Sequence, residues 1–501
     1  MSTEVVQTEQ RRANLEAITR LGFAAYPNKF DTTHSVSALV DGYAAKSKDE
    51  LEAARVDTVT AGRVVSVRSF GKASFFVLSD GRSRIQIYVR QDALSERDYQ
   101  LSKLLDLGDQ IGVAGHLFRT KTNELSIWAS SLEFLAKCFL PLPEKWHGLQ
   151  DVEIRYRQRY LDLIVNPDVR RVFETRTATV SVIRKFLEAH GFLEVETPMM
   201  QQIAGGALAR PFVTHHNALD IKLYLRIAPE LYLKRLTVGG VERVFEINRN
   251  FRNEGISTQH NPEFTMLEFY WAYVDYQRLM SFTEELLSTV ATQVVGGTQV
   301  PFGEHIINMS APFKRVSLRH AAAEEASKRL GVSVAVEELR SLETVRPLAA
   351  KLGVEVPKGA GAGKIASAIF ESLWEKNLIQ PTFVYDFPTE VSPLSKQRPD
   401  DPDTVERFEL YIGGFEVANA FSELNDPVEQ RRRFEAQLTD RAAGDQEAHA
   451  MDEDYVRALE YGMPPAGGEG IGIDRLVMVL SNSPSIRDVI LFPLMRPRAD
   501  E

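Results

Sequence analysis

The chain has 501 residues, a 44% share of hydrophobic residues and a formal net charge of −10. This length is sufficient for about two or three domains with sizeable cores, and the composition excludes a disordered or fibrous chain. The single cysteine, Cys138, excludes an intramolecular disulfide, while the polar N-terminus and the lack of a long apolar run predict no signal peptide, no membrane partner and a cytoplasmic location.

The first part of the chain predicts helices followed by a small β-domain. Residues 1–56 are polar and helix-prone, with a short amphipathic helix expected over residues 14–22. From Val59 onward, apolar and polar residues alternate in five short strands separated by turn residues. Strands of this spacing suit an oligonucleotide-binding (OB) barrel at residues 57–140, and the spacing alone fits any other small β-domain equally well.

Some side chains of these strands could contact nucleic acid. Arg68 and Phe75 could bind bases or stack on them. The neighbouring Phe76 could do the same or could lie in the core of the β-domain, and alternation alone leaves both interpretations open.

The second part of the chain predicts a larger mixed domain. Residues 141–155 include the break Leu140-Pro-Leu-Pro143 and are predicted to form a linker. From about Val172 helices and strands alternate without the regular βαβ rhythm of a parallel sheet, which predicts an α+β domain over residues 156–501. A helical stretch at about residues 318–380 carries no recognisable chemistry and is predicted to be an insertion.

The segment Arg243–Tyr273 predicts a β-hairpin with two different faces, because alternate side chains of a strand share a face. The residues of one parity are apolar: Phe245, Ile247, Phe251, Leu267, Phe269 and Trp271. The residues of the other parity carry mainly charges, amides or aromatic rings: Glu246, Asn248, Asn250, Arg252, Glu254, Phe264, Met266, Glu268 and Tyr270. Asparagine is a poor strand former, so its repetition on this second face predicts a binding face.

A later strand, Phe415–Asp426, predicts another such face. Alternation places three of its residues together: Asn419, Phe421 and Glu423. Glu409 and Glu416 flank a predicted turn at Gly413-Gly414. Simple alternation does not place Glu416 beside Asn419, so either a β-bulge intervenes or the register differs.

The segment Gly467–Leu480 predicts a glycine-rich strand that runs into an apolar helix. Glycines allow the backbone to approach a ligand closely. Arg475 lies at or near the start of the helix, and an arginine there favours a phosphate ligand.

Together these segments resemble the signature motifs of the class II aminoacyl-tRNA synthetases. Phe251–Glu254 and His260–Phe264 are similar to motif 2. Gly470–Arg475 is similar to motif 3, and Gly191–Pro198 is similar to the interface motif 1. Those that resemble the lysyl branch of the class are Glu268–Tyr270, Asn419–Asp426 and Gly205–Phe212. The resemblance runs from about Val59 to Pro497 and implies an α+β fold: an antiparallel catalytic sheet with flanking helices, preceded by an anticodon-binding OB barrel.

The resemblance also implies an activity and its partners. Such enzymes activate L-lysine with ATP to lysyl-adenylate and transfer it to the 3′ end of tRNA(Lys), with several Mg²⁺ ions per active site and a homodimer built through motif 1. The lysine carboxylate attacks the α-phosphate in line and is already ionised, so catalysis is positioning and charge neutralisation.

Individual residues acquire roles from the same resemblance. ATP is assigned to Arg252, Glu254, His260, Asn261, Phe264 and Arg475, with Arg252 and Arg475 in the catalytic role. Lysine is assigned to Gly206, Glu230, Glu268, Tyr270, Asn419, Phe421 and Glu423. Mg²⁺ is assigned to Glu409 and Glu416, and the anticodon to Arg68, Phe75 and Gln86.

The choice of lysine follows from charge. An unpaired cation in a closed pocket is costly, so Glu268 and Glu423, with the Tyr270 hydroxyl, are expected to receive the side-chain ammonium. The same carboxylates would repel aspartate, which separates this pocket from those of the aspartyl and asparaginyl relatives.

Two positions depart from the family pattern. Gln259 stands where the family usually has arginine, so one cation facing the phosphates or the acceptor end is missing. Glu469 stands at a usually apolar position of motif 3, where its charge could weaken nucleotide binding or pair with an unidentified arginine. Two other functions stay open: a relative that lysylates a protein, although such relatives lack the barrel, and a non-enzymatic RNA-binding protein.

Overall fold

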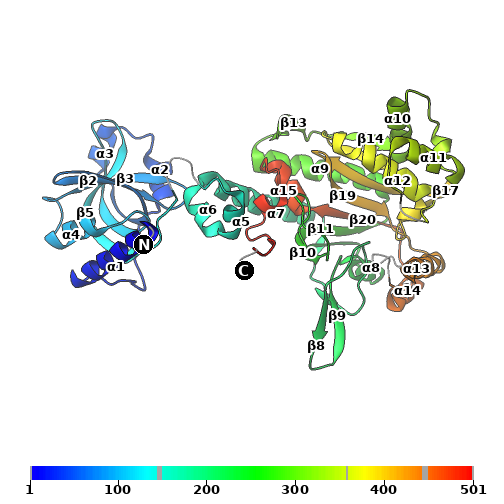
Figure 1. Cartoon of the computed structure of the whole chain (residues 1–501), viewed down its shortest axis with the longest axis horizontal. Coiled ribbons are helices and arrows are strands. Elements are labelled where there is room, and N and C mark those ends of the chain that lie inside the picture. Colours follow the sequence, from blue (N-terminus) through cyan, green and yellow to red (C-terminus); the bar gives the residue numbers. More distant parts are fainter. Residues whose placement is uncertain (1–2, 144–148, 357–358, 443–449, 499–501) are drawn as a thin grey trace. The chain divides into compact units, whose positions relative to one another are not determined.

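The computed structural model describes residues 3–143, 149–356, 359–442 and 450–498. The chain divides into two compact units, Met1–Arg170 and Arg171–Glu501. Figure 1 shows the elements of each unit. Within the described ranges, no helix combines the length and the apolar character needed to cross a membrane.

The first unit contains a closed barrel, which confirms the predicted OB fold. Its strands have the order β1-β2-β3-β5-β4. They are β1 (Asp57–Phe70), β2 (Ala73–Ser79), β3 (Arg84–Arg90), β4 (Gln110–Arg119) and β5 (Leu125–Ala136). Phe76 is 1% exposed and lies in the barrel core, so the two interpretations of this residue are resolved in favour of packing.

Several helices accompany the barrel. They are α1 (Thr3–Arg20), α2 (Val36–Tyr43), α3 (Lys48–Ala54), α4 (Glu96–Leu104), α5 (Val152–Arg157) and α6 (Arg159–Val165). Helix α1 begins well before the predicted residue 14 and is followed by Gly22 at a φ of 87°. The strand pattern did not indicate α4, whose N-cap Ser95 accepts a hydrogen bond from the Asp98 amide at 3.1 Å.

The second unit is built on an eight-stranded sheet in the order β14-β15-β18-β19-β20-β11-β10-β6. Its strands are β6 (Leu193–Glu194), β10 (Arg243–Phe251), β11 (Glu263–Ala272), β14 (Lys314–Ser317), β15 (Thr382–Tyr385), β18 (Arg407–Ile412), β19 (Phe415–Ser422) and β20 (Ala466–Gly472). All neighbours are antiparallel except β14 with β15 and β10 with β6. The predicted α+β class with an antiparallel catalytic sheet is therefore confirmed.

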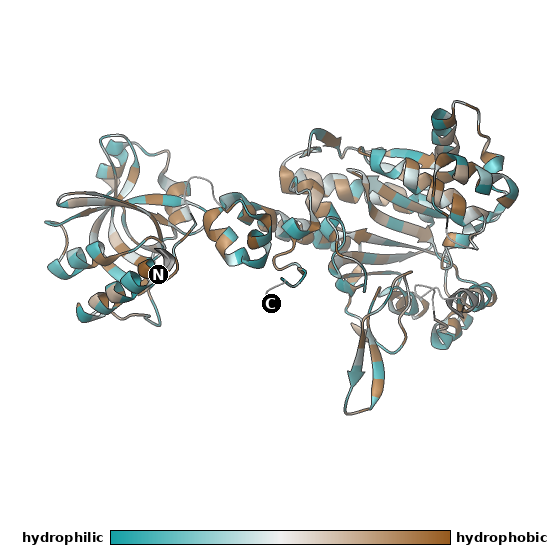
Figure 2. Ribbon diagram, viewed as in Figure 1, coloured by the Kyte–Doolittle hydropathy of each residue, from teal (hydrophilic) through white to brown (hydrophobic). Residues whose placement is uncertain are grey.

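One face of this sheet is buried in the main hydrophobic core. Helices α7 (Pro167–Ala189), α9 (Tyr276–Val295) and α15 (Ile473–Leu480) contribute residues to the core together with the apolar parity of β10 and β11. Figure 2 shows the hydrophobic residues of α9, and ten residues of this helix are buried. The opposite face of the central strands is left for the pocket described below.

The second unit contains further helices and strands outside this sheet. Helices are α8 (Glu230–Val238), α10 (Leu318–Leu330), η1 (Val336–Leu339), α11 (Leu342–Leu352), α12 (Ala362–Leu373), η2 (Glu375–Asn377), η3 (Thr389–Val391), α13 (Pro427–Ala442), α14 (Glu453–Glu460) and α16 (Ile486–Val489). Strands are β7 (Met200–Gln201), β8 (Val213–His216), β9 (Ile221–Leu225), β12 (Gln299–Phe302), β13 (His305–Asn308), β16 (Gln397–Arg398) and β17 (Asp401–Val405). Hairpin β8–β9 projects away from the central sheet (Figure 1).

The register explains why distant residues share one face. In β10 and β11, Glu246 pairs with Glu268, as the predicted two-faced hairpin requires. Between β18 and β19 the register shifts: Leu410 pairs with Ala418, and the next residue, Tyr411, pairs with Glu416. One residue of β19 is therefore extra, and this β-bulge returns Glu416 to the same side as the rest of the binding face. The bulge interpretation is confirmed.

Candidate active site

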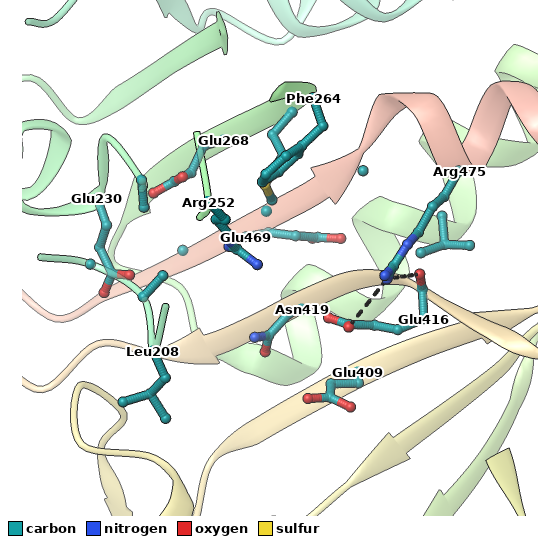
Figure 3. A pocket seen from close by; sticks show the side chains of 18 of the residues that line it. Leu208, Glu230, Arg252, Phe264, Glu268, Glu409, Glu416, Asn419, Glu469 and Arg475 are labelled. Atoms are coloured by element: carbon teal, nitrogen blue, oxygen red, sulfur yellow. Dashed lines mark hydrogen bonds and ion pairs between the residues drawn. The ribbon is translucent and has the colours of Figure 1, made fainter. Parts of the chain in front are cut away.

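A pocket of about 380 Å³ lies on the face of β11, β19 and β20 that is turned away from the main core. Figure 3 shows Glu230 and Glu268 at one end, Arg475 and Glu416 at the other, and Arg252 between them. A volume of this order suits a small-molecule ligand. The acidic and basic ends predict a ligand with positive charge at one end and negative charge at the other.

Glycines of β20 form the floor of this pocket. A Cβ at Gly468 would lie 2.1 Å from Glu423 Oε1 and 2.4 Å from Tyr270 Cε1. A Cβ at Gly470 would lie 2.9 Å from Met266 Cε. The side chains of the neighbouring strands occupy the space that these glycines leave free, which is the physical reason for the glycine-rich strand.

The acidic end collects carboxylates from different elements. Glu230 at the start of α8 and Glu268 on β11 are 6% and 5% exposed. The Tyr270 hydroxyl donates to Glu268 Oε1 at 2.7 Å. Burial, with the nearby Glu230 carboxylate, raises the pKa of Glu268 to about 8. A bound ammonium group would relieve both effects.

Glu423 borders this end beside Gly468 without lining the pocket, and it already has a cationic neighbour. Its carboxylate forms an ion pair with Lys234 of α8, and Lys234 Nζ is also 2.5 Å from Glu230 Oε1. Lys234 has no exposed side chain and lies over the Phe421 ring, 5.2 Å from its centroid. Helical periodicity alone gave no signal for this lysine, and it was missed from the sequence.

Gly206 closes the acidic end. Its φ is 89°, and a Cβ there would lie 2.9 Å from the Glu230 Cβ. Only glycine fits this combination of backbone angle and close approach. The residue lines the pocket with Ala207 and Leu208.

Arg252 follows the end of β10 in the middle of the pocket. Its guanidinium lies over the Phe264 ring, 5.0 Å from the centroid. The buried Nε has no hydrogen-bond partner among the described residues. Burial lowers the pKa of Arg252, although Glu254 and Glu416 oppose this effect, and the group remains a cation. A half-buried cation with a buried, unpartnered donor is suited to an anionic ligand.

The basic end is formed by the motif similar to motif 3. Arg475 is the third residue of α15, and its Nη1 donates to the Glu416 carbonyl at 2.7 Å. Its Nη2 is 3.2 Å from His260 Nε2. Burial and Arg475 lower the pKa of His260, so its imidazole is neutral at pH 7.

The motif 2 loop completes this end. Glu254 and Gln259 line the pocket, and no cation replaces the missing arginine at position 259. Asn261 is 7% exposed and donates from Nδ2 to the Glu263 carbonyl at 2.6 Å. Its buried Oδ1 has no partner among the described residues, so it can accept a hydrogen bond from a ligand.

Arg407 of β18 was also missed from the sequence. Its Nε donates to Asn419 Oδ1 at 3.0 Å, and its Nη2 lies 2.5 Å from Glu409 Oε1. The first bond leaves the Asn419 amide nitrogen to donate into the pocket. Arg407 therefore orients two of the predicted site residues.

Glu409 and Glu416 have the donor chemistry that Mg²⁺ requires. Burial raises the pKa of Glu409 to about 7, with Arg407 lowering it and Glu416 raising it. A cation between like charges would relieve that repulsion, and Mg²⁺ takes carboxylate and phosphate oxygens while keeping several waters. Among the described residues, no group of three or more His, Cys, Asp and Glu side chains is placed to hold a metal. The two carboxylates therefore fit Mg²⁺ only if ligand phosphates and waters complete its coordination.

Glu469 requires a correction. It pairs with Phe269 and Ala420, on the core face of β20, and its side chain is 2% exposed. Its carboxyl oxygens lie 2.8 and 2.6 Å from Thr283 Oγ1. Burial raises the pKa of Glu469 to about 8. It therefore neither pairs with an arginine nor directs a charge at a nucleotide. Its position between Gly468 and Gly470 was the signal in the sequence, because alternation places it on the face opposite these two glycines.

The barrel carries its own candidate surface. Arg68 Nη2 donates to Gln86 Oε1 at 3.4 Å. The Phe75 ring is stacked on Tyr88 with centroids 4.7 Å apart. The Tyr88 ring in turn contacts Trp128, 5.1 Å away in an edge-on arrangement. Arg68 and Gln86 thus contact each other, and Phe75 stacks on a ring that the sequence had not singled out; basic, amide and aromatic side chains in this combination are typical of single-stranded nucleic-acid binding.

Comparisons with known proteins agree with this organisation. The family model described as "tRNA synthetases class II (D, K and N)" matches residues 151–496, and the model "OB-fold nucleic acid binding domain" matches residues 58–135. A lysine–tRNA ligase of Carboxydothermus hydrogenoformans is 56% identical over 488 residues, 97% of each chain. The lysine–tRNA ligase of Bacillus subtilis is 52% identical over 98% of this chain and 97% of its own. A heat-inducible lysine–tRNA ligase of Escherichia coli is 52% identical over 98% of this chain and 96% of its own.

Proposed function

Since the chain belongs to the lysine–tRNA ligase branch of the class II aminoacyl-tRNA synthetases, we propose that its pocket binds lysine at the acidic end and ATP at the basic end. The function is the ATP-dependent activation of L-lysine to lysyl-adenylate and its transfer to the 3′ end of tRNA(Lys) for protein synthesis in the cytoplasm. The observation that carries the assignment of the pocket is Arg252, a half-buried cation whose buried Nε has no partner among the described residues and which lies between the two ends.

Arg252 and Arg475 are the catalytic residues of this proposal. Arg252 bridges the lysine carboxylate and the α-phosphate, so the two reacting groups are held together and their charges are neutralised. Arg475 holds the γ-phosphate end of ATP. No general base is required, because the attacking carboxylate is ionised before it binds.

Lysine recognition uses the acidic end. Glu268 and Glu423, with the Tyr270 hydroxyl, receive the side-chain ammonium, and Phe421 lines the alkyl stem. The α-amino group is received by Glu230 and the Gly206 backbone, while the Asn419 amide nitrogen contacts the carboxylate. The fixed orientation of Asn419 by Arg407 supports the last assignment.

ATP recognition uses the motif 2 loop. Phe264 stacks on adenine, and the residues that fix the nucleotide are Glu254, His260 and Asn261. Glu409 and Glu416 hold Mg²⁺, which supplies charge neutralisation at the phosphates when bound. The neutral state of His260 supports a role as a hydrogen-bonding group rather than as a charge.

The barrel and motif 1 complete the proposal. Residues 57–140 form the anticodon-binding domain, where Arg68, Phe75 and Gln86 contact bases, after a helical extension at residues 1–56. A linker at residues 141–155 leads to the catalytic domain at 156–501, with its insertion at about 318–380.

The protein is proposed to act as a homodimer. Large hydrophobic side chains are exposed at and after motif 1: Leu193, Met199, Met200 and Val213. Apolar side chains gathered on a surface are typical of interfaces. Sedimentation at micromolar concentration checks the dimer, and a monomer in the presence of lysine, ATP and tRNA would contradict it.

Amino-acid-dependent ATP–pyrophosphate exchange across all twenty amino acids tests the function. Exchange should be confined to lysine, and tRNA charging should accompany it. Arg252→Ala should abolish exchange without unfolding the protein, because the carboxylate and phosphate would repel each other unscreened. Arg249→Ala, on the opposite parity of β10, is the matched control. Exchange without any charging of tRNA would favour the protein-lysylating alternative, and full exchange in Arg252→Ala would refute its catalytic role.

A further inference from the structure

Lys234 contacts the carboxylates of the acidic end but has no role in the function proposed above. It extends from α8, its side chain has no exposure, and its ammonium contacts Glu230 and Glu423 together. Burial lowers the pKa of Lys234, but the Glu230 and Glu423 carboxylates outweigh this effect, and its pKa is raised. Lys234 is therefore a permanent cation that borders the acidic end of the pocket without lining it.

The surrounding charges are matched by other partners. Arg226 Nη1 is 2.6 Å from Glu246 Oε1, which neutralises the acid of β10 that lies behind the pocket. Arg407 pairs with Glu409 in the same way. Within the described part of the chain, Lys234 is the ion-pair partner of Glu230 and Glu423, and the carboxyl group of Glu268 forms no ion pair.

When all three carboxyl groups of the acidic end are ionised, its charge balance is incomplete by two. Three carboxylates face one resident cation. Buried charges are stable only when they are paired or neutralised by protons. Lysine brings two ammonium groups, and its carboxylate is matched separately by Arg252. The three carboxylates would then face three cations: the α-ammonium, the side-chain ammonium and Lys234.

We propose that Lys234 is a positioning and specificity-determining residue, which fixes Glu230 and Glu423 in place and leaves the pocket short of the two positive charges that an α,ω-diamino acid carries. This inference rests on the proposed function and adds to it the residue that sets the charge of the pocket. An amino acid with an uncharged side chain would leave one buried carboxylate without a partner, and it is excluded for that reason.

A packing role for Lys234 makes a different prediction. Its ammonium lies over the Phe421 ring, and the fully buried Tyr455 is close enough to contribute to its raised pKa. If only this packing mattered, neutralising Glu230 as well would add a second defect to the first. If charge balance matters, neutralising Glu230 should compensate for the loss of Lys234.

The experiment compares Lys234→Met, Glu230→Gln and the double variant by calorimetric titration with lysine and by the KM values for lysine and ATP in pyrophosphate exchange. Lys234→Met should weaken lysine binding by on the order of 100-fold, because Glu230 and Glu423 lose the cation that holds them in place and one carboxylate of the lysine complex is left without a partner. Its KM for ATP should stay within about twofold, as the basic end is unchanged. The double variant should bind lysine at least several-fold more tightly than Lys234→Met. Lys222→Met, an exposed lysine of β9, is the control and should change neither constant.

The possible results are distinct. A double variant as weak as the product of the two single losses would overturn the charge-balance role. Equal losses for lysine and ATP in Lys234→Met would assign Lys234 to packing. Lys234→Gln, which retains hydrogen-bond donors, is compared in the same cycle and decides the question if Lys234→Met does not fold. Lysine-dependent pyrophosphate exchange by the unaltered protein tests the proposed function independently of these variants.

Discussion

Glu469→Leu is expected to stabilise the catalytic domain and to reduce its sensitivity to pH. The Thr283 hydroxyl oxygen is 2.8 Å from the Leu279 carbonyl and 2.6 Å from Glu469 Oε2. A hydroxyl has a single proton to donate. When that proton goes to Leu279, the Thr283 oxygen is left to accept from a protonated Glu469. Geometry and burial therefore both favour the neutral acid.

The magnitude follows from linkage. The pKa of Glu469 rises from its ordinary value of 4.5 to about 8 on folding. The folded state then holds a proton that the unfolded state has released, so stability is fully present below about pH 4.5 and is lost as pH rises toward 8. Each pH unit between the two values costs ~1.4 kcal/mol. Between pH 5 and pH 8 the loss from this group is about 3 kcal/mol.

Scanning calorimetry at pH 5 and pH 8 measures this loss. The unaltered protein should lose several degrees more than Glu469→Leu between the two conditions, because only the former must hold the proton. Glu469→Gln removes the titration without removing the polar group and should show the same flattened dependence. Thr283→Val removes the hydrogen-bond partner and should raise the pH sensitivity or leave it unchanged. Exchange activity should be retained in all three, since these side chains lie on the core face. An identical pH dependence in Glu469→Leu and the unaltered protein would refute the reasoning.

Three further outcomes are expected. Lysine affinity should rise by up to about tenfold per pH unit between pH 6 and 8, because the carboxyl group of Glu268, whose pKa is raised to about 8, must lose its proton to receive an ammonium. Titration calorimetry measures this dependence, and Glu268→Gln should give a flatter profile. The same slope in Glu268→Gln and the unaltered protein would contradict the prediction. Glu423→Gln should raise the KM for lysine roughly 10- to 100-fold and leave that for ATP nearly unchanged, and equal losses would mean that the pocket is misassigned. Phe75→Ala should raise the KM for tRNA roughly tenfold without affecting pyrophosphate exchange, and an unchanged KM would remove Phe75 from the anticodon surface.

The sequence predicted the binding faces best in strands, where the alternation of side chains shows which residues share a face. A strand has a period of two, so the binding face of Arg243–Tyr273 could be assigned before its register was known. The same period showed that Glu416 did not fit its face, and the observed β-bulge is the reason. Alternation alone does not show where a single extra residue lies, because the strand alternates regularly both before and after it.

The sequence predicted least where partners come from distant elements. Lys234 is one of several polar residues on a short helix, and its burial depends on Glu423, which is 189 residues away. Arg407 likewise acts through its neighbours on β18 and β19. Helix α4 was missed for a local reason, since a Ser95 cap and an acidic first turn are weak signals among strands.

The buried acids of the catalytic domain separate into two groups. Glu246 and Glu469 form the first group and are satisfied within the chain: Glu246, which shares the face of Glu268 but does not line the pocket, by Arg226, and Glu469 of the core face by its own proton and Thr283. Among the acids that line or border the acidic end, the described residues offer Glu268 only a tyrosine hydroxyl, and the carboxylate of Glu423 shares one lysine with Glu230. A fold able to neutralise the first group could have neutralised the second, so the deficit at the acidic end is better explained by a ligand than by imperfect packing. A ligand that supplies two ammonium groups at this spacing, and a carboxylate beside Arg252, has the charge distribution of lysine.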